Sequence, residues 1–146
     1  MLLGRYMHNL DAKGRVIMPS KLREEIGDTF VVAKGFDSCL AVYSEEEYQN
    51  LAQKVLALPS NLPETRILRR QILAEAQTCE ADKQGRFVVP PVLREMAGIV
   101  REVVIVGNGD HAEIWDCDKW NEYMYGDSSM SFEEAAASLH DKGWTF

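Results

Sequence analysis

The residues whose types and spacing most clearly suggest a chemical role are an aspartate and an arginine four positions apart, a pair that occurs twice. Asp11 and Arg15 enclose the stretch DAKGR, and Asp82 and Arg86 enclose DKQGR. Aspartate can accept hydrogen bonds from nearby backbone N–H groups, and glycine permits the positive φ of a tight turn. An arginine so close also favours an ion-paired carboxylate with a lowered pKa over acid–base catalysis. The residues expected to structure these two loops are Asp11, Gly14, Asp82 and Gly85.

The arginines of these loops are suited to contact DNA. A guanidinium group on a rigid turn can bind phosphate, or can donate two hydrogen bonds to guanine in the major groove. More Lys and Arg residues surround each loop in the sequence. The candidate DNA-binding residues are Arg5, Lys13, Arg15, Lys21 and Arg23 for the first loop, and Lys83, Arg86 and Arg94 for the second. The alternative is that aspartate and arginine only hold a turn.

The remaining polar residues predict neither a metal site nor an enzyme. The three cysteines and three histidines are scattered, with no CxxC motif and no close spacing of four donors. The GxSxG and HExxH motifs and a phosphate-binding glycine loop are absent, and GNGD at 107–110 is explained by a hairpin turn. We therefore expect no catalytic residue, no metal and no cofactor.

Both loops belong to an internal repeat. Within positions 8–27, eight residues recur 71 positions later. They are Asp11, Gly14, Arg15, Pro19, Leu22, Arg23, Glu24 and Gly27, which match Asp82, Gly85, Arg86, Pro90, Leu93, Arg94, Glu95 and Gly98. After one inserted residue, Val31 and Val32 match Val103 and Val104, and Tyr43 matches Trp115. Two copies are too few for a solenoid, so the repeat predicts a pair packed about a pseudo-twofold axis.

Each copy predicts the same elements around its loop. RVIMP and RFVVP are short strands ended by proline, and SKLREEIG and PVLREMAG are short helices ended by glycine. TFVVAKG and EVVIVG are buried strands that form hairpins with CLAVY and AEIW. Four further helices are expected: one capped by Ser44 with Glu47, one over Arg66–Thr78, one after Asp116, and one capped by Ser131 with Glu134. The expected fold class is α+β.

The charge is distributed unevenly, although its sum is −7. Residues 1–34 contain six Lys and Arg against four Asp and Glu, whereas residues 109–146 contain two against nine. The acidic segment is expected to be a solvated face, or to keep the molecule off DNA except at its basic loops. No apolar run reaches the ~18 residues of a membrane span, and MLLGRYMHNLD lacks the apolar core of a signal peptide. We expect no membrane partner and, from the scattered cysteines, a reducing cytoplasm.

The two DxxxR motifs, each followed by P-x-x-L-R at Pro19–Arg23 and Pro90–Arg94, resemble the MraZ family. The similarity covers about residues 1–125 and is close in GRFVVPPVLREMAG and VVIVGNGDHAEIW. It implies two tandem swapped-hairpin, AbrB-like β-barrel-type repeats, and a bacterial transcriptional regulator that associates with the nucleoid. It also implies a ring of identical subunits that binds direct repeats of double-stranded DNA upstream of the division and cell wall gene cluster, including its own gene. By motif position, Arg15 and Arg86 inherit the DNA-contacting role.

We therefore expect a first repeat at residues 5–52, a helical connector at 53–77, a second repeat at 78–124 and an acidic C-terminal segment at 125–146. The predicted function is sequence-specific DNA binding by a homo-oligomer larger than a tetramer, in which many weakly basic loops act together. The alternatives are an oligomeric protein–protein scaffold and an antitoxin-like DNA-binding dimer. The intact loop pair argues against a scaffold, and the fusion of two copies without a disordered tail argues against an antitoxin.

Overall fold

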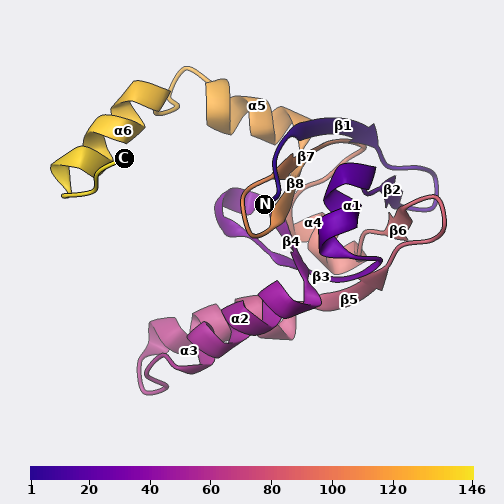
Figure 1. Ribbon diagram of the computed structural model, residues 1–146, viewed down its shortest axis with the longest axis horizontal. Coiled ribbons are helices and arrows are strands. Elements are labelled where there is room, and N and C mark those ends of the chain that lie inside the picture. Colours follow the sequence, from indigo (N-terminus) through magenta and orange to yellow (C-terminus); the bar gives the residue numbers. More distant parts are fainter. The chain divides into compact units, whose positions relative to one another are not determined.

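The computed structural model describes residues 1–146 and divides into two units, Met1–Asp116 and Cys117–Phe146 (Figure 1). The first unit contains the strands of both copies. The first copy contributes β1 (Arg5–Asn9), β2 (Arg15–Ile17), β3 (Thr29–Lys34) and β4 (Leu40–Ser44). The second copy contributes β5 (Gln77–Glu80), β6 (Arg86–Val88), β7 (Glu102–Gly107) and β8 (Ala112–Asp116).

The strands of the two copies are interleaved. One sheet has the order β1-β7-β8-β4-β3-β5, and a second sheet consists of β2 and β6. Replacing every strand by its counterpart in the other copy simply reverses the first order, so the copies are related by a pseudo-twofold axis. Only β3–β4 and β7–β8 pair within a copy, and every pair is antiparallel. The expected α+β class and tandem repeat are confirmed.

The pairing register corrects the alignment of the buried strands. His8 lies opposite Val103 in β1–β7, whereas Cys79, the counterpart of His8, lies opposite Phe30 in β5–β3. Val103 therefore corresponds to Phe30 and not to Val31, as the sequence match predicted. The shift arises because the second copy has two more residues before its buried strand and one fewer in the following hairpin turn.

The helices of the first unit follow the strands. α1 (Ser20–Ile26) and α4 (Pro91–Met96) come directly after β2 and β6. α2 (Glu45–Leu56) begins as predicted, because Ser44 Oγ accepts a hydrogen bond from Glu47 N–H at 3.1 Å. The helix predicted over Arg66–Thr78 has different bounds. It runs as α3 (Pro63–Arg69), starting on a proline that needs no N–H partner there, and continues into the π-helical turn η2 (Arg70–Ala74).

The end of the predicted second helix is a strand instead. β5 begins at Gln77 and pairs with β3, from Thr29↔Glu80 to Val32↔Gln77. This pairing gives one side of β3 its backbone hydrogen-bond partners, which outweighs the helical preference of the preceding residues. The strand β1, which the sequence reasoning did not identify, pairs with β7 in the equivalent position.

The hydrophobic core joins the two copies. Phe30 from β3 and Phe87 from β6 are completely buried and meet edge to face, with ring centroids 4.9 Å apart. Leu22 from α1 and Leu93 from α4 are buried in the same cluster. Because each copy contributes half of these side chains, burial of the core requires both copies.

The second unit contains two helices, α5 (Cys117–Tyr125) and α6 (Phe132–Asp141). Ser131 Oγ accepts from Glu134 N–H at 3.1 Å, so the cap predicted for α6 is present. None of the residues of α6 is buried. No helix anywhere in the chain has the length and apolar character that crossing a bilayer demands.

Candidate nucleic-acid interface

The first DxxGR loop is closed by the carboxylate of Asp11. Its Oδ1 accepts hydrogen bonds from the N–H groups of Lys13 and Arg15, both at 2.9 Å. Its Oδ2 accepts from Arg15 Nε at 2.7 Å. Gly14, at the tightest point, has a φ of 74°, which a residue with a side chain rarely adopts. One aspartate thus holds both the turn of the backbone and the arginine that follows it.

The second loop repeats this arrangement with the same lengths. Asp82 Oδ1 accepts from the N–H groups of Gln84 and Arg86 at 2.9 Å, and Oδ2 accepts from Arg86 Nε at 2.7 Å. Gly85 has a φ of 81°. The loops therefore share one geometry, although lysine occupies the third position of DAKGR and glutamine the third position of DKQGR.

These bonds keep both carboxylates ionised. The backbone N–H of Arg15 contributes most to lowering the pKa of Asp11, followed by the guanidinium group of the same residue. Arg86 lowers the pKa of Asp82 in the same way. Neither arginine side chain makes another hydrogen bond or ion pair within the chain. The terminal Nη groups of both arginines therefore remain as donors for a ligand.

The two loops lie next to each other because β2 pairs with β6. Met18 N–H donates to Gly85 O in the other copy's loop at 2.8 Å. Val89 N–H donates to Gly14 O at 3.0 Å. Two guanidinium groups that are far apart in the sequence are thus presented on a single two-stranded ladder, where Arg15 lies opposite Val88 and Arg86 opposite Ile17.

A second pair of arginines crosses between the copies. A methyl group placed on Gly85 would lie 2.7 Å from Arg23 Nη1, and one on Gly14 would lie 3.5 Å from Arg94 Nη1. Each arginine of a P-x-x-L-R motif therefore packs against the loop of the other copy. Arg23 Nε pairs with Asp28 at 3.0 Å, and Arg94 Nη2 donates to Val100 O at 2.9 Å. These bonds hold the two side chains under the loops.

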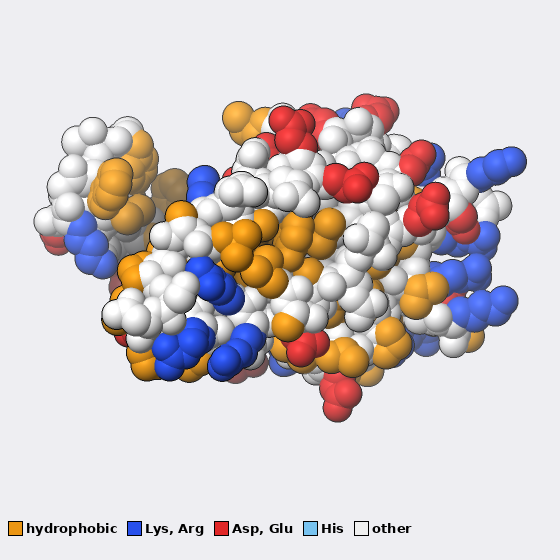
Figure 2. Space-filling model, turned by 90° about the horizontal axis from the view of Figure 1, so that it is seen from below, with side chains coloured by type: hydrophobic (Ala, Val, Ile, Leu, Met, Phe, Trp, Pro, Cys, Tyr) orange, Lys and Arg blue, Asp and Glu red, His pale blue; other side chains and the backbone are white.

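The remaining predicted residues fall into two groups. Lys13 and Lys83 are exposed within the loops, and Figure 2 shows Lys and Arg side chains projecting together where β2 and β6 end the first unit. Lys21 is exposed near the start of α1. Arg5 is different, because it is the first residue of β1, whereas the first loop comes after Asn9, the last residue of that strand. At about 3.3 Å per residue, it lies about 13 Å from Asn9, so the structure does not bring Arg5 to the loops.

Sequence reasoning missed two apolar residues between the arginines. Ile17 and Val88 are 43% and 51% exposed on the ladder, whereas their neighbours Val16 and Phe87 are buried. The alternation within RVI and RFV is a signal that could have revealed this outer face. Exposed methyl groups beside guanidinium groups can contact the methyl group of thymine in a major groove.

The other titratable residues form no metal-binding cluster in this chain. No group of three His, Cys, Asp or Glu side chains is arranged to hold a metal ion. Cys39, Cys79 and Cys117 are all free thiols, and burial raises the pKa of Cys79 to about 11.

The comparison with protein families identifies both halves of the chain. The family model described as "MraZ protein, putative antitoxin-like" matches residues 1–71 and again residues 72–142. The two matches together cover nearly the whole sequence and coincide with the two copies of the repeat.

The chain is also similar to curated proteins named "Transcriptional regulator MraZ". It is 48% identical to the one from Thermoanaerobacter sp. (strain X514) over 141 residues, which cover 97% of this chain and 98% of that protein. It is 44% identical to that of Heliobacterium modesticaldum, with the same coverage of both chains. A solution structure from Pyrococcus horikoshii is 16% identical and covers 78% of this chain and 88% of its own, but at a TM-score of 0.30 the likeness carries no argument.

Proposed function

The chain belongs to the MraZ family, and from that premise we propose that it is a sequence-specific DNA-binding transcriptional regulator that reads DNA with its paired loops. The relatives are named as transcriptional regulators and not as enzymes. The observation that carries the proposal is the β2–β6 ladder, which presents Arg15 and Arg86 together with their Nη groups unoccupied.

The roles of the loop residues follow from their bonds. Asp11 and Asp82 shape the loops and orient the arginines, so they act on DNA through another side chain. Arg15 and Arg86 contact base edges or phosphates, and Lys13 and Lys83 add phosphate contacts, whose strength falls steeply with salt. Lys21 belongs to the same basic surface, Arg23 and Arg94 support it from beneath, and Arg5 makes at most a separate contact.

The regulator acts as a closed ring larger than a tetramer. Strands β1 and β5 end the main sheet, and each leaves one side of its backbone without a strand partner. Such edges favour pairing or covering by another copy. A ring places many modest sites side by side, so direct repeats upstream of the division and cell wall genes, including its own gene, are bound far more tightly than a single site. Because these repeats lie in chromosomal DNA, the ring works in the cytoplasm at the nucleoid.

The net charge of −7 does not oppose this function. Binding depends on the potential near the loops and not on the total charge. The nine Asp and Glu residues of positions 109–146 account for the excess, and residues 1–34 carry a surplus of two positive charges.

A fluorescence titration tests the proposal. The full chain is titrated against its own upstream DNA and against a scrambled duplex of equal length, at several salt concentrations. We expect tighter binding to the upstream DNA, and loss of that preference in Arg15→Ala. Lys54→Ala, which removes an exposed charge from α2, is the matched control and should bind like the wild type. Equal affinity for both duplexes in the wild type would contradict sequence-specific binding, and absence of binding to either duplex would favour the scaffold.

The second candidate function is the antitoxin-like dimer, which the description of the family model favours. The mass of the assembly in solution distinguishes this dimer from a ring. Light scattering of the full chain at physiological salt should give more than four subunits. A stable dimer would favour the antitoxin-like function and contradict the ring.

A further inference from the structure

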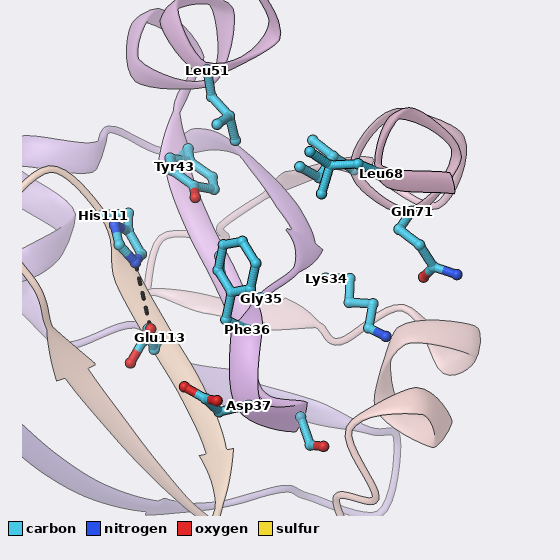
Figure 3. Close-up of a pocket in the computed structure, with 13 residues that line it drawn as sticks. Lys34, Gly35, Phe36, Asp37, Tyr43, Leu51, Leu68, Gln71, His111 and Glu113 are labelled. Carbon is cyan, nitrogen blue, oxygen red and sulfur yellow. Dashed lines mark ion pairs between the residues drawn. The ribbon is translucent and has the colours of Figure 1, made fainter. Parts of the chain in front are cut away.

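A pocket of about 440 Å³ lies in the first unit (Figure 3), and none of its lining residues belongs to the two DxxGR loops. Its floor comes from β4 and β8, one wall from Leu51 of α2 and Leu68 of α3, and its rim from the turn that joins β3 to β4. The volume falls in the range of small-molecule sites, which is about 300–1,000 Å³. The function proposed above makes no use of this pocket.

The backbone is irregular on two sides of the pocket. Asp37 and Ser38 in the rim have φ values of 62° and 70°, which residues with side chains rarely adopt. The opposite wall includes Gln71 and Ile72, which belong to the π-helical turn η2. Both kinds of irregularity are frequent at binding sites.

Aromatic rings dominate one side of the pocket. Tyr43 stacks on His111 with ring centroids 5.1 Å apart and an angle of 26°. Phe36, which is 77% exposed, stands in the pocket below Tyr43 (Figure 3). An apolar ring this exposed in the mouth of a cavity offers its face to a ligand. Aromatic faces carry negative potential and attract cations.

Carboxylates lie beside these rings. Asp37 lines the rim, and Glu113 lies 3.5 Å from His111 Nε2. Burial alone would raise the pKa of Glu113, but hydrogen bonds from His111 and Trp115 lower it overall, so the side chain is an ionised carboxylate. Lys34 is the only Lys or Arg in the lining, and its side chain extends away from the rings (Figure 3).

We propose that this pocket binds a small organic cation, in which an ammonium group is attached to an apolar alkyl or aryl body. The ammonium group lies against Phe36 and Tyr43 within reach of Asp37 and Glu113. The apolar body packs against Leu51, Leu68 and Ile72 on the helical wall. The positive charge of a protonated His111 is offset by Glu113 and Asp110, which both pair with it. An anion of the same size would therefore meet the carboxylate of Asp37 and the negative faces of the rings, so the site discriminates by charge.

The test compares three probes that share one apolar body. The full chain, labelled with ¹⁵N, is titrated with phenethylamine, phenethyl alcohol and phenylacetate, and NMR shifts are followed for the backbone amides of the pocket residues. We expect saturable shifts at Phe36, Tyr43 and His111 with the amine, weaker binding of the alcohol, and no saturation with phenylacetate. Equal or tighter binding of phenylacetate, or shifts outside the pocket only, would overturn the proposal.

Two variants remove single charges while keeping the shape. Asp37→Asn suits the left-handed conformation that aspartate adopts there, and Glu113→Gln retains an acceptor for Trp115 Nε1. Each should weaken amine binding by about threefold, the size of a partly exposed ion pair. Phe36→Ala should weaken it by about two- to fivefold through the lost ring face.

The control is Glu102→Gln, which removes an exposed carboxylate at the start of β7 and outside the pocket. It should leave the affinity for phenethylamine unchanged. Undiminished amine binding in both Asp37→Asn and Glu113→Gln would contradict the proposed recognition, even if the amine binds somewhere on the protein.

Discussion

The two copies of the repeat are alike at their DxxGR loops and different at their hairpin turns. The loops have matching hydrogen bonds, matching glycine conformations and the same aspartate–arginine distance of 2.7 Å. The turn at Gly35–Cys39 contains an exposed phenylalanine and two left-handed residues, whereas the turn at 108–111 has only a left-handed glycine, Gly109. Symmetry is thus kept at the loops that we propose bind DNA, and lost where the two copies build the two sides of one pocket.

The comparison predicts which changes affect the copies equally. The largest effect is expected in the shared core, where Phe30 and Phe87 pack across the copies. Phe30→Ala and Phe87→Ala should each lower the free energy of unfolding by about 3–5 kcal/mol. Chemical denaturation measures the loss, and Val88→Ala on the exposed face is the control that should change little. Unchanged stability in either variant would show that the two copies do not share one core.

The next effect concerns DNA binding and distinguishes the two loops. Arg15→Ala should cost about 1–3 kcal/mol for each engaged subunit and weaken discrimination among operators. Arg86→Ala should affect specificity less, because Glu80 precedes the second loop in the sequence, whereas the sequence around the first loop contains more Lys and Arg residues. Lys13→Ala should mainly reduce the salt dependence.

Titration of each variant against operator and scrambled DNA at several salt concentrations, with the oligomer mass checked, measures this ranking. Because the two loops have the same geometry, a difference between the two arginine variants must come from the surrounding residues. If Arg86→Ala is as damaging as Arg15→Ala in an intact assembly, both loops must be counted as equal readers.

A smaller effect is expected for the aspartates. Asp11→Ala and Asp82→Ala should each lower the melting temperature modestly and weaken DNA binding by releasing the arginine. Because the folded pKa of each group is lowered, its contribution to stability is present above the ordinary value of 3.8 and lost as the pH falls through the folded value. NMR titration of the side-chain carboxyl carbons should give a pKa below 3.8 for both. Unchanged melting with abolished DNA binding would instead place the carboxylate at the DNA itself.

The pocket provides a test of the difference between the two hairpin turns. Glu113, the more buried of two carboxylates, contributes most to raising the pKa of His111, and the exposed Asp110 contributes less although it lies closer, at 2.7 Å. The contribution of protonated His111 to the stability of the fold is therefore complete below the ordinary pKa of 6.5, and it is lost as the pH rises through the raised pKa. NMR should show the pKa of His111 above 6.5 in the wild type and lower in Glu113→Gln. An unchanged value would assign the shift to Asp110.

The smallest effect is expected for the second unit. Truncation after Gly126 removes Asp127, Glu133, Glu134 and Asp141 but only one basic residue, Lys142. We expect the interleaved strands to stay folded and non-specific DNA affinity to rise slightly at low salt, where repulsion is least screened. Circular dichroism and DNA titration measure the two effects. Aggregation of the shortened chain would show that the last helix is needed for the core or for assembly.

Local signals in the sequence predicted most elements of the fold. Proline and glycine mark the ends of β2, β6, α1 and α4, and capping serines mark α2 and α6. Strands β1 and β5 were missed because RYMHN and QTCE are short and polar at the edge of the sheet, where a tertiary partner decides the conformation. The sequence alignment of β3 with β7 was also wrong by one residue, because two valine-rich strands align equally well when one is shifted by one position.

The loop residues were recognisable from their spacing, but their arrangement was not. Nothing in the sequence indicates that Arg23 packs under the loop at Gly85, or Arg94 under the loop at Gly14. Those contacts depend on the pairing of β2 with β6, which joins residues far apart in the chain. The pocket is likewise a product of tertiary structure, since Phe36, Leu68 and His111 come from three separate segments.

The interleaving of strands also sets the order in which a nascent chain can fold. β3 and β4 can pair with each other early, but β3 lacks its second partner until β5 has left the ribosome, and β4 lacks its second partner until β8 has done so. β1 has no partner until β7 is made, and β8 ends at Asp116. Domains usually form from the N-terminus onward during synthesis, and contacts distant in sequence slow folding. Here the first copy must remain open until nearly the whole chain is made, with β3 and β4 exposed to neighbouring chains on the same message. A growing polysome is therefore the setting in which a strand from another molecule has its best opportunity to take the place of the chain's own.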